Sequence, residues 1–189
     1  MADDDPVALG STAAHDSTAA HDSTAAHDST AELIADLTAR GLTIAVAESL
    51  TGGELVAELT RPAGASAVVL GGVVVYATEL KHSMIGVDQS LLDAHGPVHA
   101  DVADQLARGV RTRLSVADRP ADIGISTTGV AGPDAQGGRA PGTVFLGLSV
   151  GDRTRVVELA LTGTRAEIRR QVVRRAIAEL VSDLRTRPN

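Results

Sequence analysis

The 189-residue chain contains no cysteine and no tryptophan, and it has only one phenylalanine and one tyrosine. The absence of cysteine excludes disulfides, thiolate metal sites and a cysteine nucleophile, and it fits a cytoplasmic protein. A core must therefore be built from aliphatic residues, for which the 43% hydrophobic content is sufficient. The longest apolar run, residues 67–77, is too short to cross a bilayer, so we expect no membrane partner.

Basic charge is too sparse for nucleic acid to be the expected partner. The net charge is −7, and residues 1–28 hold six Asp but neither Lys nor Arg. The rest of the chain is close to neutral, whereas domains that bind nucleic acid carry a basic patch. The acidic start also lacks the apolar segment of a signal peptide, which again predicts a cytoplasmic location.

Lysine is the scarcest charged residue. All but one of the 17 basic residues are Arg, and the exception, Lys81, follows the only tyrosine, Tyr76, by five positions. Arg cannot be deprotonated in a protein, whereas a Lys that is removed from water can act as a base. Lys81 is therefore a candidate catalytic base, although one lysine retained by chance is the alternative.

The N-terminal segment is repetitive. The six residues Ser-Thr-Ala-Ala-His-Asp at 11–16 recur at 17–22 and 23–28. Each unit has too little apolar material to fold, and the period is far shorter than that of solenoid repeats. We predict a disordered low-complexity tail over residues 1–28 and a folded domain over residues 29–187.

The domain shows alternating helical and strand patterns. Gly-rich and Pro-rich breaks separate the segments, and a Ser-Thr-Ala-Glu capping box at 29–32 predicts a helix start. Predicted helices cover residues 29–40, 54–60, 77–85, 88–94, 101–115 and 165–184; predicted strands cover 42–46, 67–76, 121–126 with its continuation to 133, 143–150 and 154–161. This order predicts an α/β fold with a mixed sheet and helices on both faces.

The stretch Ala47-Glu-Ser-Leu-Thr-Gly-Gly53 lies between a buried strand and a helix. Its glycines allow close approach of a ligand to the backbone, and the unpaired N–H groups of a helix start attract negative charge. We therefore predict Ser49 as a nucleophile, with donors for an oxyanion at Gly52 and Gly53. The alternative is that Ser49 or Thr51 only caps the helix.

Two further stretches should lie beside this one at the strand ends, where open α/β sheets bind ligands. They are Tyr76-Ala-Thr-Glu-Leu-Lys81 and Thr128-Gly-Val-Ala-Gly-Pro133. Ser49, Tyr76 and Lys81 would then meet, and Lys81 could take the Ser49 proton directly or through Tyr76. The irregularly spaced His82, His95 and His99 show no metal-ligand pattern, so no metal is expected.

These three motifs, in this order and spacing, resemble the CinA carboxy-terminal domain family over roughly residues 30–185. The resemblance implies a three-layer α/β/α sandwich without a cofactor. Larger members of the family carry a preceding domain, whereas we expect this chain to be a stand-alone form. It implies hydrolysis of the carboxamide of nicotinamide mononucleotide, as in pyridine nucleotide salvage, with Ser49, Tyr76 and Lys81 as catalytic residues. A homodimer is expected by the same likeness.

The same resemblance suggests where the nucleotide substrate binds. Its polar contacts map onto Thr128 with Gly129 and onto Arg165, in addition to the turn at Thr51, Gly52 and Gly53. A cation in the first turn of a helix opposes the helix dipole, which hints at a bound anion such as phosphate near Arg165. This chain differs from the usual family pattern in having Leu50 and Thr78, and a short loop at 137–142.

Two other functions remain as alternatives. One is a nicotinamide-linked oxidoreductase using Ser, Tyr and Lys, but that class places Tyr and Lys four residues apart on one helix. The chain also has no G-x-G-x-x-G after its first strand. The other is a non-catalytic nucleotide-binding or interaction module with the same fold.

Overall fold

The computed structural model describes residues 18–186, and the side chains of residues 29–186. Five strands and six α-helices are present in this part of the chain, together with a short 3₁₀ turn, Ala65–Ala67, and a π-helical turn, Lys81–Ile85. The helices are α1 Thr18–Arg40, α2 Glu54–Thr60, α3 Thr78–Leu80, α4 Gln89–His95, α5 Ala100–Arg113 and α6 Arg165–Arg185. The strands are β1 Ile44–Glu48, β2 Val69–Val74, β3 Ile123–Gly129, β4 Thr143–Val150 and β5 Arg153–Ala160.

The strands form one mixed sheet in the order β2-β1-β3-β4-β5. Strand β1 is parallel to β2 and β3, whereas β4 and β5 continue the sheet in antiparallel fashion. The register of β1 against β2 shifts between Ile44 and Ala45, close to Gly71 and Gly72. The parallel half matters for function because the carboxyl ends of β1, β2 and β3 all reach the same edge.

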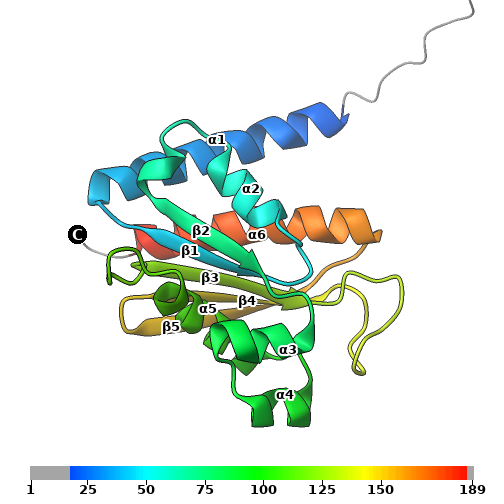
Figure 1. Ribbon diagram of the computed structural model, residues 1–189. Coiled ribbons are helices and arrows are strands. Elements are labelled where there is room, and N and C mark those ends of the chain that lie inside the picture. Colours follow the sequence, from blue (N-terminus) through cyan, green and yellow to red (C-terminus); the bar gives the residue numbers. More distant parts are fainter. Residues whose placement is uncertain (1–17, 187–189) are drawn as a thin grey trace, which may run out of the picture.

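Helices cover both faces of the sheet, which confirms the predicted three-layer α/β/α sandwich (Figure 1). On one face α1, α2 and α6 pack on an aliphatic core that includes Leu37, Leu55 and Val172. On the other face α5 lies across the sheet, and residues such as Val87, Leu92 and Leu106 form a second core. The only phenylalanine, Phe145, belongs to a small third cluster, so the core is aliphatic, as predicted.

Helix α1 begins earlier than the sequence predicted. It starts at Thr18 and continues through the capping box at 29–32, so residues 18–28, which we predicted to be disordered, are helical. Alanine is frequent in these repeats and has the highest helix propensity, which favours continuation of the helix. Instead of capping the helix, the Thr30 hydroxyl donates to Glu58 on α2 at 2.7 Å. The rest of the predicted tail, residues 1–17, lies outside the described residues.

Helix α5 packs against the sheet at glycine positions. A Cβ added at Gly124 on β3 would overlap the carbonyl oxygen of Ala107 on α5, and one added at Gly147 on β4 would overlap that of Ala103. Both overlaps are with helix backbone, which cannot move without displacing the whole of α5. Close contact between α5 and the two strands therefore depends on glycine, which has no side chain, at positions 124 and 147.

We expect Gly124→Ala to lower the free energy of unfolding by about 3 kcal/mol, because the added methyl overpacks a rigid contact. Chemical denaturation measures the loss. Gly151→Ala in the β4–β5 turn is the control, since its Cβ would meet no heavy atom within 4 Å and costs only the strain of a φ of 57°. Equal losses in the two variants would contradict the close-packing explanation.

Candidate active site

The expected nucleophile lies just beyond the carboxyl end of β1. Ser49 follows Glu48, the last residue of the strand, and is 8% exposed. In the sheet, Glu48 pairs with Val74 on β2, and Ala47 pairs with Ser126 on β3. The residues that follow these partners, Tyr76 and Thr128, are therefore brought beside Ser49, as the sequence predicted.

The buried carboxylate of Glu48 caps helix α2. It accepts hydrogen bonds from the N–H groups of Gly53 at 2.9 Å, Leu55 at 3.1 Å and Val56 at 2.8 Å. Neither Ser49 nor Thr51 makes a side-chain hydrogen bond to α2, so the alternative that they only cap the helix is wrong. The helix start is already occupied by an anion, so Gly53 is not available as an oxyanion donor.

Side chains from two other elements hold the Ser49 turn in place. The hydroxyl of Thr127 on β3 accepts from the Ser49 N–H at 3.3 Å and is 2.8 Å from the Thr51 hydroxyl. Arg169 on α6 donates to the Thr51 carbonyl at 2.8 Å and pairs with Glu54 at 2.7 Å. The sequence analysis missed Thr127 and Arg169, and the only available signal was that Thr127 precedes a predicted substrate residue.

Lys81 reaches Ser49 from the other side. The π-helical turn that it begins directs its amine into the protein, where the residue is only 1% exposed. Its Nζ donates to the Val75 carbonyl at 2.7 Å, the Tyr76 carbonyl at 3.3 Å and the Ser49 Oγ at 3.3 Å. Burial lowers the pKa of Lys81 from 10.5 to about 8, against a smaller opposing effect of Glu79.

The phenol of Tyr76 faces the mouth of the pocket and not the Lys81 amine. The residue is 59% exposed, so it is not core filler, and its hydroxyl accepts from the Arg165 guanidinium at 3.0 Å. Arg165, on the first turn of α6, also donates to the Gly132 carbonyl at 3.0 Å. The Ser49 proton can therefore pass to Lys81 directly, and the route through the Tyr76 phenol is not supported by this geometry.

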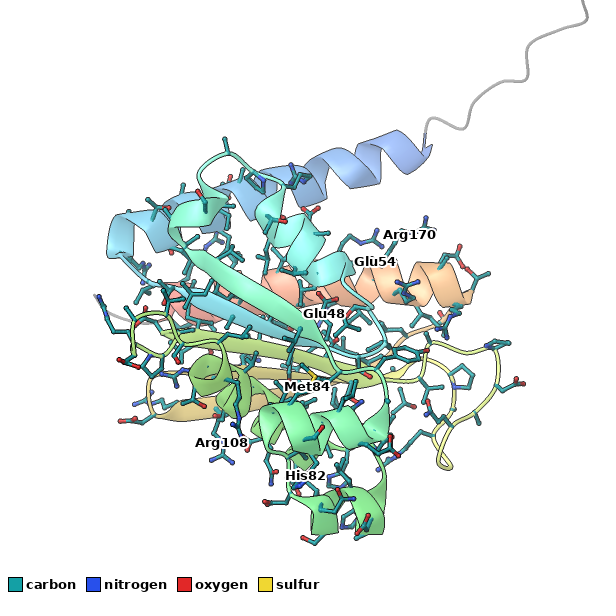
Figure 2. The ribbon with its side chains drawn as sticks, viewed as in Figure 1. Glu48, Glu54, His82, Met84, Arg108 and Arg170 are labelled. Atoms are coloured by element: carbon teal, nitrogen blue, oxygen red, sulfur yellow. The ribbon has the colours of Figure 1, made fainter. Side chains whose placement is uncertain are left out.

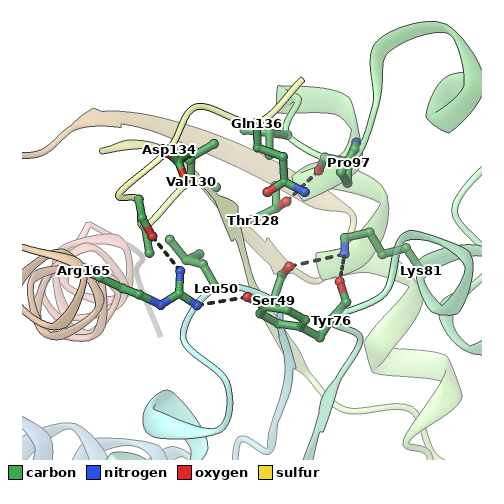
Figure 3. A pocket seen from close by; sticks show the side chains of 14 residues that line it. Ser49, Leu50, Tyr76, Lys81, Pro97, Thr128, Val130, Asp134, Gln136 and Arg165 are labelled. Carbon is green, nitrogen blue, oxygen red and sulfur yellow. Dashed lines mark hydrogen bonds between the residues drawn. The ribbon is translucent and has the colours of Figure 1, made fainter. Parts of the chain in front are cut away.

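These residues surround a pocket of about 520 Å³, including its open mouth (Figure 3). Six predicted residues line it: Ser49, Tyr76, Lys81, Thr128, Gly129 and Arg165. The predicted substrate residues Thr51, Gly52 and Gly53 are not in its lining, because their turn folds back against β3 and α6. The sequence analysis missed other lining residues, among them Leu50, Pro97, Asp134 and Gln136.

The Thr128 hydroxyl, expected to contact substrate, donates to the carbonyl of Pro97 at 2.6 Å. This bond joins β3 to the segment that precedes α5, and it leaves the oxygen of the hydroxyl available as an acceptor at the pocket wall. Among the described residues, the Leu50 N–H has no hydrogen-bond partner, and it belongs to the residue after Ser49. It is thus a better candidate than Gly52 or Gly53 for the oxyanion donor.

Charged side chains such as Arg108 and Arg170 are exposed on the molecular surface, away from the pocket (Figure 2). Among the side chains of residues 29–186 there is no group of three or more His, Asp or Glu that could hold a metal ion. The same part of the chain has no helix long and apolar enough to cross a membrane. The chemical groups that the pocket offers include the Ser49 hydroxyl beside the buried amine of Lys81.

Comparison with known proteins places the chain in a family. The model of the CinA C-terminal domain matches residues 26–184. A CinA-like protein of Frankia casuarinae is 47% identical over 137 residues, which are 72% of this chain and 30% of that protein. The chain spans about a third of the length of the curated relatives it matches.

Solved structures agree with this match. Competence damage-inducible protein A of Klebsiella pneumoniae has a TM-score of 0.80 and 31% identity, covering 86% of this chain and 99% of that one. The competence/damage inducible protein CihA of Agrobacterium tumefaciens has a TM-score of 0.77 and 32% identity, covering 83% and 94%. The chain belongs to the CinA C-terminal domain family.

Proposed function

We propose that this domain is an amidohydrolase that converts nicotinamide mononucleotide to nicotinate mononucleotide and ammonia. The observation that carries the proposal is the 3.3 Å contact between Ser49 Oγ and the buried Nζ of Lys81 at the base of an open pocket. A serine hydroxyl needs a neighbouring base to act as a nucleophile at neutral pH, and a desolvated lysine supplies one. The nucleotide is suggested by the family motifs and by Arg165 at the pocket mouth.

The first half of the reaction transfers the acyl group to Ser49. The neutral Lys81 amine donates its two hydrogens to the carbonyls of Val75 and Tyr76 and takes the Ser49 proton with its lone pair. Ser49 Oγ bonds to the carboxamide carbon, and the Leu50 N–H donates to the resulting oxyanion. The C–N bond then breaks, and Lys81 returns the proton to the leaving nitrogen as ammonia forms.

The second half regenerates the enzyme. A water molecule loses a proton to Lys81 and attacks the acyl carbon, and the bond between that carbon and Ser49 Oγ breaks. Ser49 takes back the proton from Lys81, and the new carboxylic acid gives its own proton to the ammonia, so that nicotinate mononucleotide leaves as a carboxylate and ammonia as ammonium. Atoms and charges balance without a metal or a redox cofactor.

The oxidoreductase alternative is weakened by the direction of the Tyr76 side chain. That chemistry requires the phenol and the lysine amine to act together. Here the Tyr76 hydroxyl contacts Arg165, and the only part of Tyr76 that the Lys81 amine contacts is the backbone carbonyl. Incubation of the pure protein with nicotinamide mononucleotide separates the other two functions. Release of one ammonia for each nicotinate mononucleotide supports the amidohydrolase, and binding without ammonia would support the non-catalytic module.

The activity should depend on pH through Lys81. We expect kcat/KM to rise with pH and to level off above about 8, because burial holds the pKa of Lys81 near that value and only its neutral amine accepts a proton. Lys81 is the only lysine, so lysine-selective isotope labelling gives a single side-chain NMR signal that titrates independently of turnover. A rate that is flat between pH 6 and 9 would contradict a lysine base.

Arg165 should bind the phosphate of the substrate through its guanidinium. The N-terminus of α6 is closed by the capping box of Thr164 and Glu167, so the side chain, and not the helix start, faces the pocket. We expect Arg165→Ala to raise KM about 10- to 100-fold with little change in kcat, since a charged hydrogen bond contributes about 1.5–3 kcal/mol. Steady-state kinetics with the nucleotide measures the change.

Two controls make the Arg165 experiment specific. Nicotinamide riboside lacks the phosphate, so the variant and the wild type should use it equally well. Arg175→Ala, at an exposed position on the same helix that pairs with Glu179, should leave the KM for the nucleotide unchanged. A loss of kcat alone in Arg165→Ala, with normal substrate binding, would exclude the phosphate role.

A further inference from the structure

The loop between β3 and β4 forms one wall of the pocket. It contributes Asp134 and Gln136 to the lining, and Figure 3 shows Asp134 on the same side as Arg165 and Gln136 above Thr128. Both side chains therefore face the pocket from this wall, Asp134 toward the side of Arg165 and Gln136 toward Thr128. The mechanism and the phosphate contact described above make no use of either residue.

Asp134 and Gln136 differ from the other polar side chains of the pocket in having no partner. In the part of the chain that the structure describes, neither side chain makes a hydrogen bond or an ion pair, and only the Gln136 backbone is bonded, to Arg139. By contrast, Ser49 is bonded to Lys81, Thr128 to Pro97, and Arg165 to Tyr76 and Gly132. The unpartnered pair is free to contact a ligand.

The chemistry of a carboxylate limits what that ligand can present. An ionised Asp accepts hydrogen bonds and donates none, and it repels a phosphate. Asp134 would therefore face hydrogen-bond donors on the substrate and not its phosphate. In a pyridine nucleotide the ribose carries such donors, and its neighbouring hydroxyls can donate to one carboxylate, as they do to the acidic residue of dinucleotide-binding folds.

We propose that Asp134, with Gln136 beside it, binds the 2′- and 3′-hydroxyls of the substrate ribose and restricts the site to ribonucleotides. This inference rests on the proposed amidohydrolase function and specifies its substrate class. Asp134 accepts from the hydroxyls, and the Gln136 amide can donate to or accept from the same groups. A site built to pair hydroxyls discriminates strongly against an analogue that lacks them, because its polar groups are then left unpaired.

The test compares nicotinamide mononucleotide with its 2′-deoxy and 3′-deoxy analogues, in the wild type and in Asp134→Ala. We expect the wild type to lose at least about tenfold in kcat/KM on at least one deoxy analogue, from a lost hydrogen bond to a charged group. Asp134→Ala should lose a similar factor on the complete nucleotide, mainly through KM, and should no longer distinguish it from that analogue. Asp152→Ala, an exposed aspartate in the β4–β5 turn, is the control and should behave as the wild type.

The outcomes separate this inference from the proposed function. Ammonia released equally well from all three nucleotides by the wild type would overturn the ribose contact and leave the amidohydrolase in place. An Asp134→Ala variant whose kcat/KM falls by the same factor on every substrate would also overturn the ribose contact. The carboxylate would then contact the pyridinium ring or stabilise the fold. Release of no ammonia from any of the three would overturn the proposed function itself.

Discussion

Lys81→Arg is expected to reduce the rate of ammonia release by at least about 10³-fold, although it keeps the positive charge at the site. An arginine side chain cannot lose its proton at accessible pH, so it cannot accept one from Ser49. The lysine amine, by contrast, is buried and its pKa is lowered to about 8, which leaves part of it neutral near physiological pH. The variant therefore separates the role of a base from that of a fixed cation, with single-turnover ammonia release as the measurement.

The larger guanidinium must fit where Lys81 is 1% exposed, so a second variant is needed. Lys81→Met matches the length of the side chain without its amine and should be equally inactive. Circular dichroism and thermal unfolding establish that each variant is folded. Retention of substantial turnover by a folded Lys81→Arg protein would show that Lys81 acts only through its charge, and the base would have to be another group.

The two residues that we propose as nucleophile and base could be selected from the sequence, because their chemistry limits which residue types can serve. Ser49 stands between a buried strand and a helix start, and Lys81 is the single lysine in a chain that otherwise uses arginine. Parallel pairing of β1 with β2 and β3 then brings the motif-bearing strand ends together, as the order of elements suggested. The fold followed from the same alternation of strand and helix patterns.

The supporting contacts could not be predicted, because they depend on side chains that come from distant elements or fold back on their own turn. Glu48 caps α2 from the end of β1 and occupies the Gly53 N–H, while the Gly52 N–H donates to the Ser49 carbonyl. Arg169 contacts the Thr51 carbonyl across 118 positions of sequence. The early start of α1 was missed because the alanine-rich repeat continues the helix through the capping pattern at 29–32.

Ser49→Ala is expected to reduce turnover by about 10⁴-fold or more, because removing a nucleophile that acts as one unit with its base eliminates nearly all of the catalysis. The Ser49 hydroxyl is hydrogen-bonded only to Lys81 among the described residues, so the variant should fold and should still bind the nucleotide. Substrate binding to the inactive variant can be measured by calorimetry. Ser83→Ala, at an exposed position on the turn that carries Lys81, is the control and should retain activity.

The covalent intermediate gives this prediction its most direct test. If Ser49 carries the acyl group, rapid acid quenching of the wild type during turnover should trap protein whose mass is increased by the acyl nucleotide, and peptide mapping should locate the addition at Ser49. Neither Ser49→Ala nor the quenched wild type without substrate should show the addition. Ser49→Ala could instead release ammonia at the wild-type rate in a single turnover. Lys81 would then activate water to attack the carboxamide directly. In that case Ser49 would be a binding residue, and the buried amine of Lys81 would still be the base.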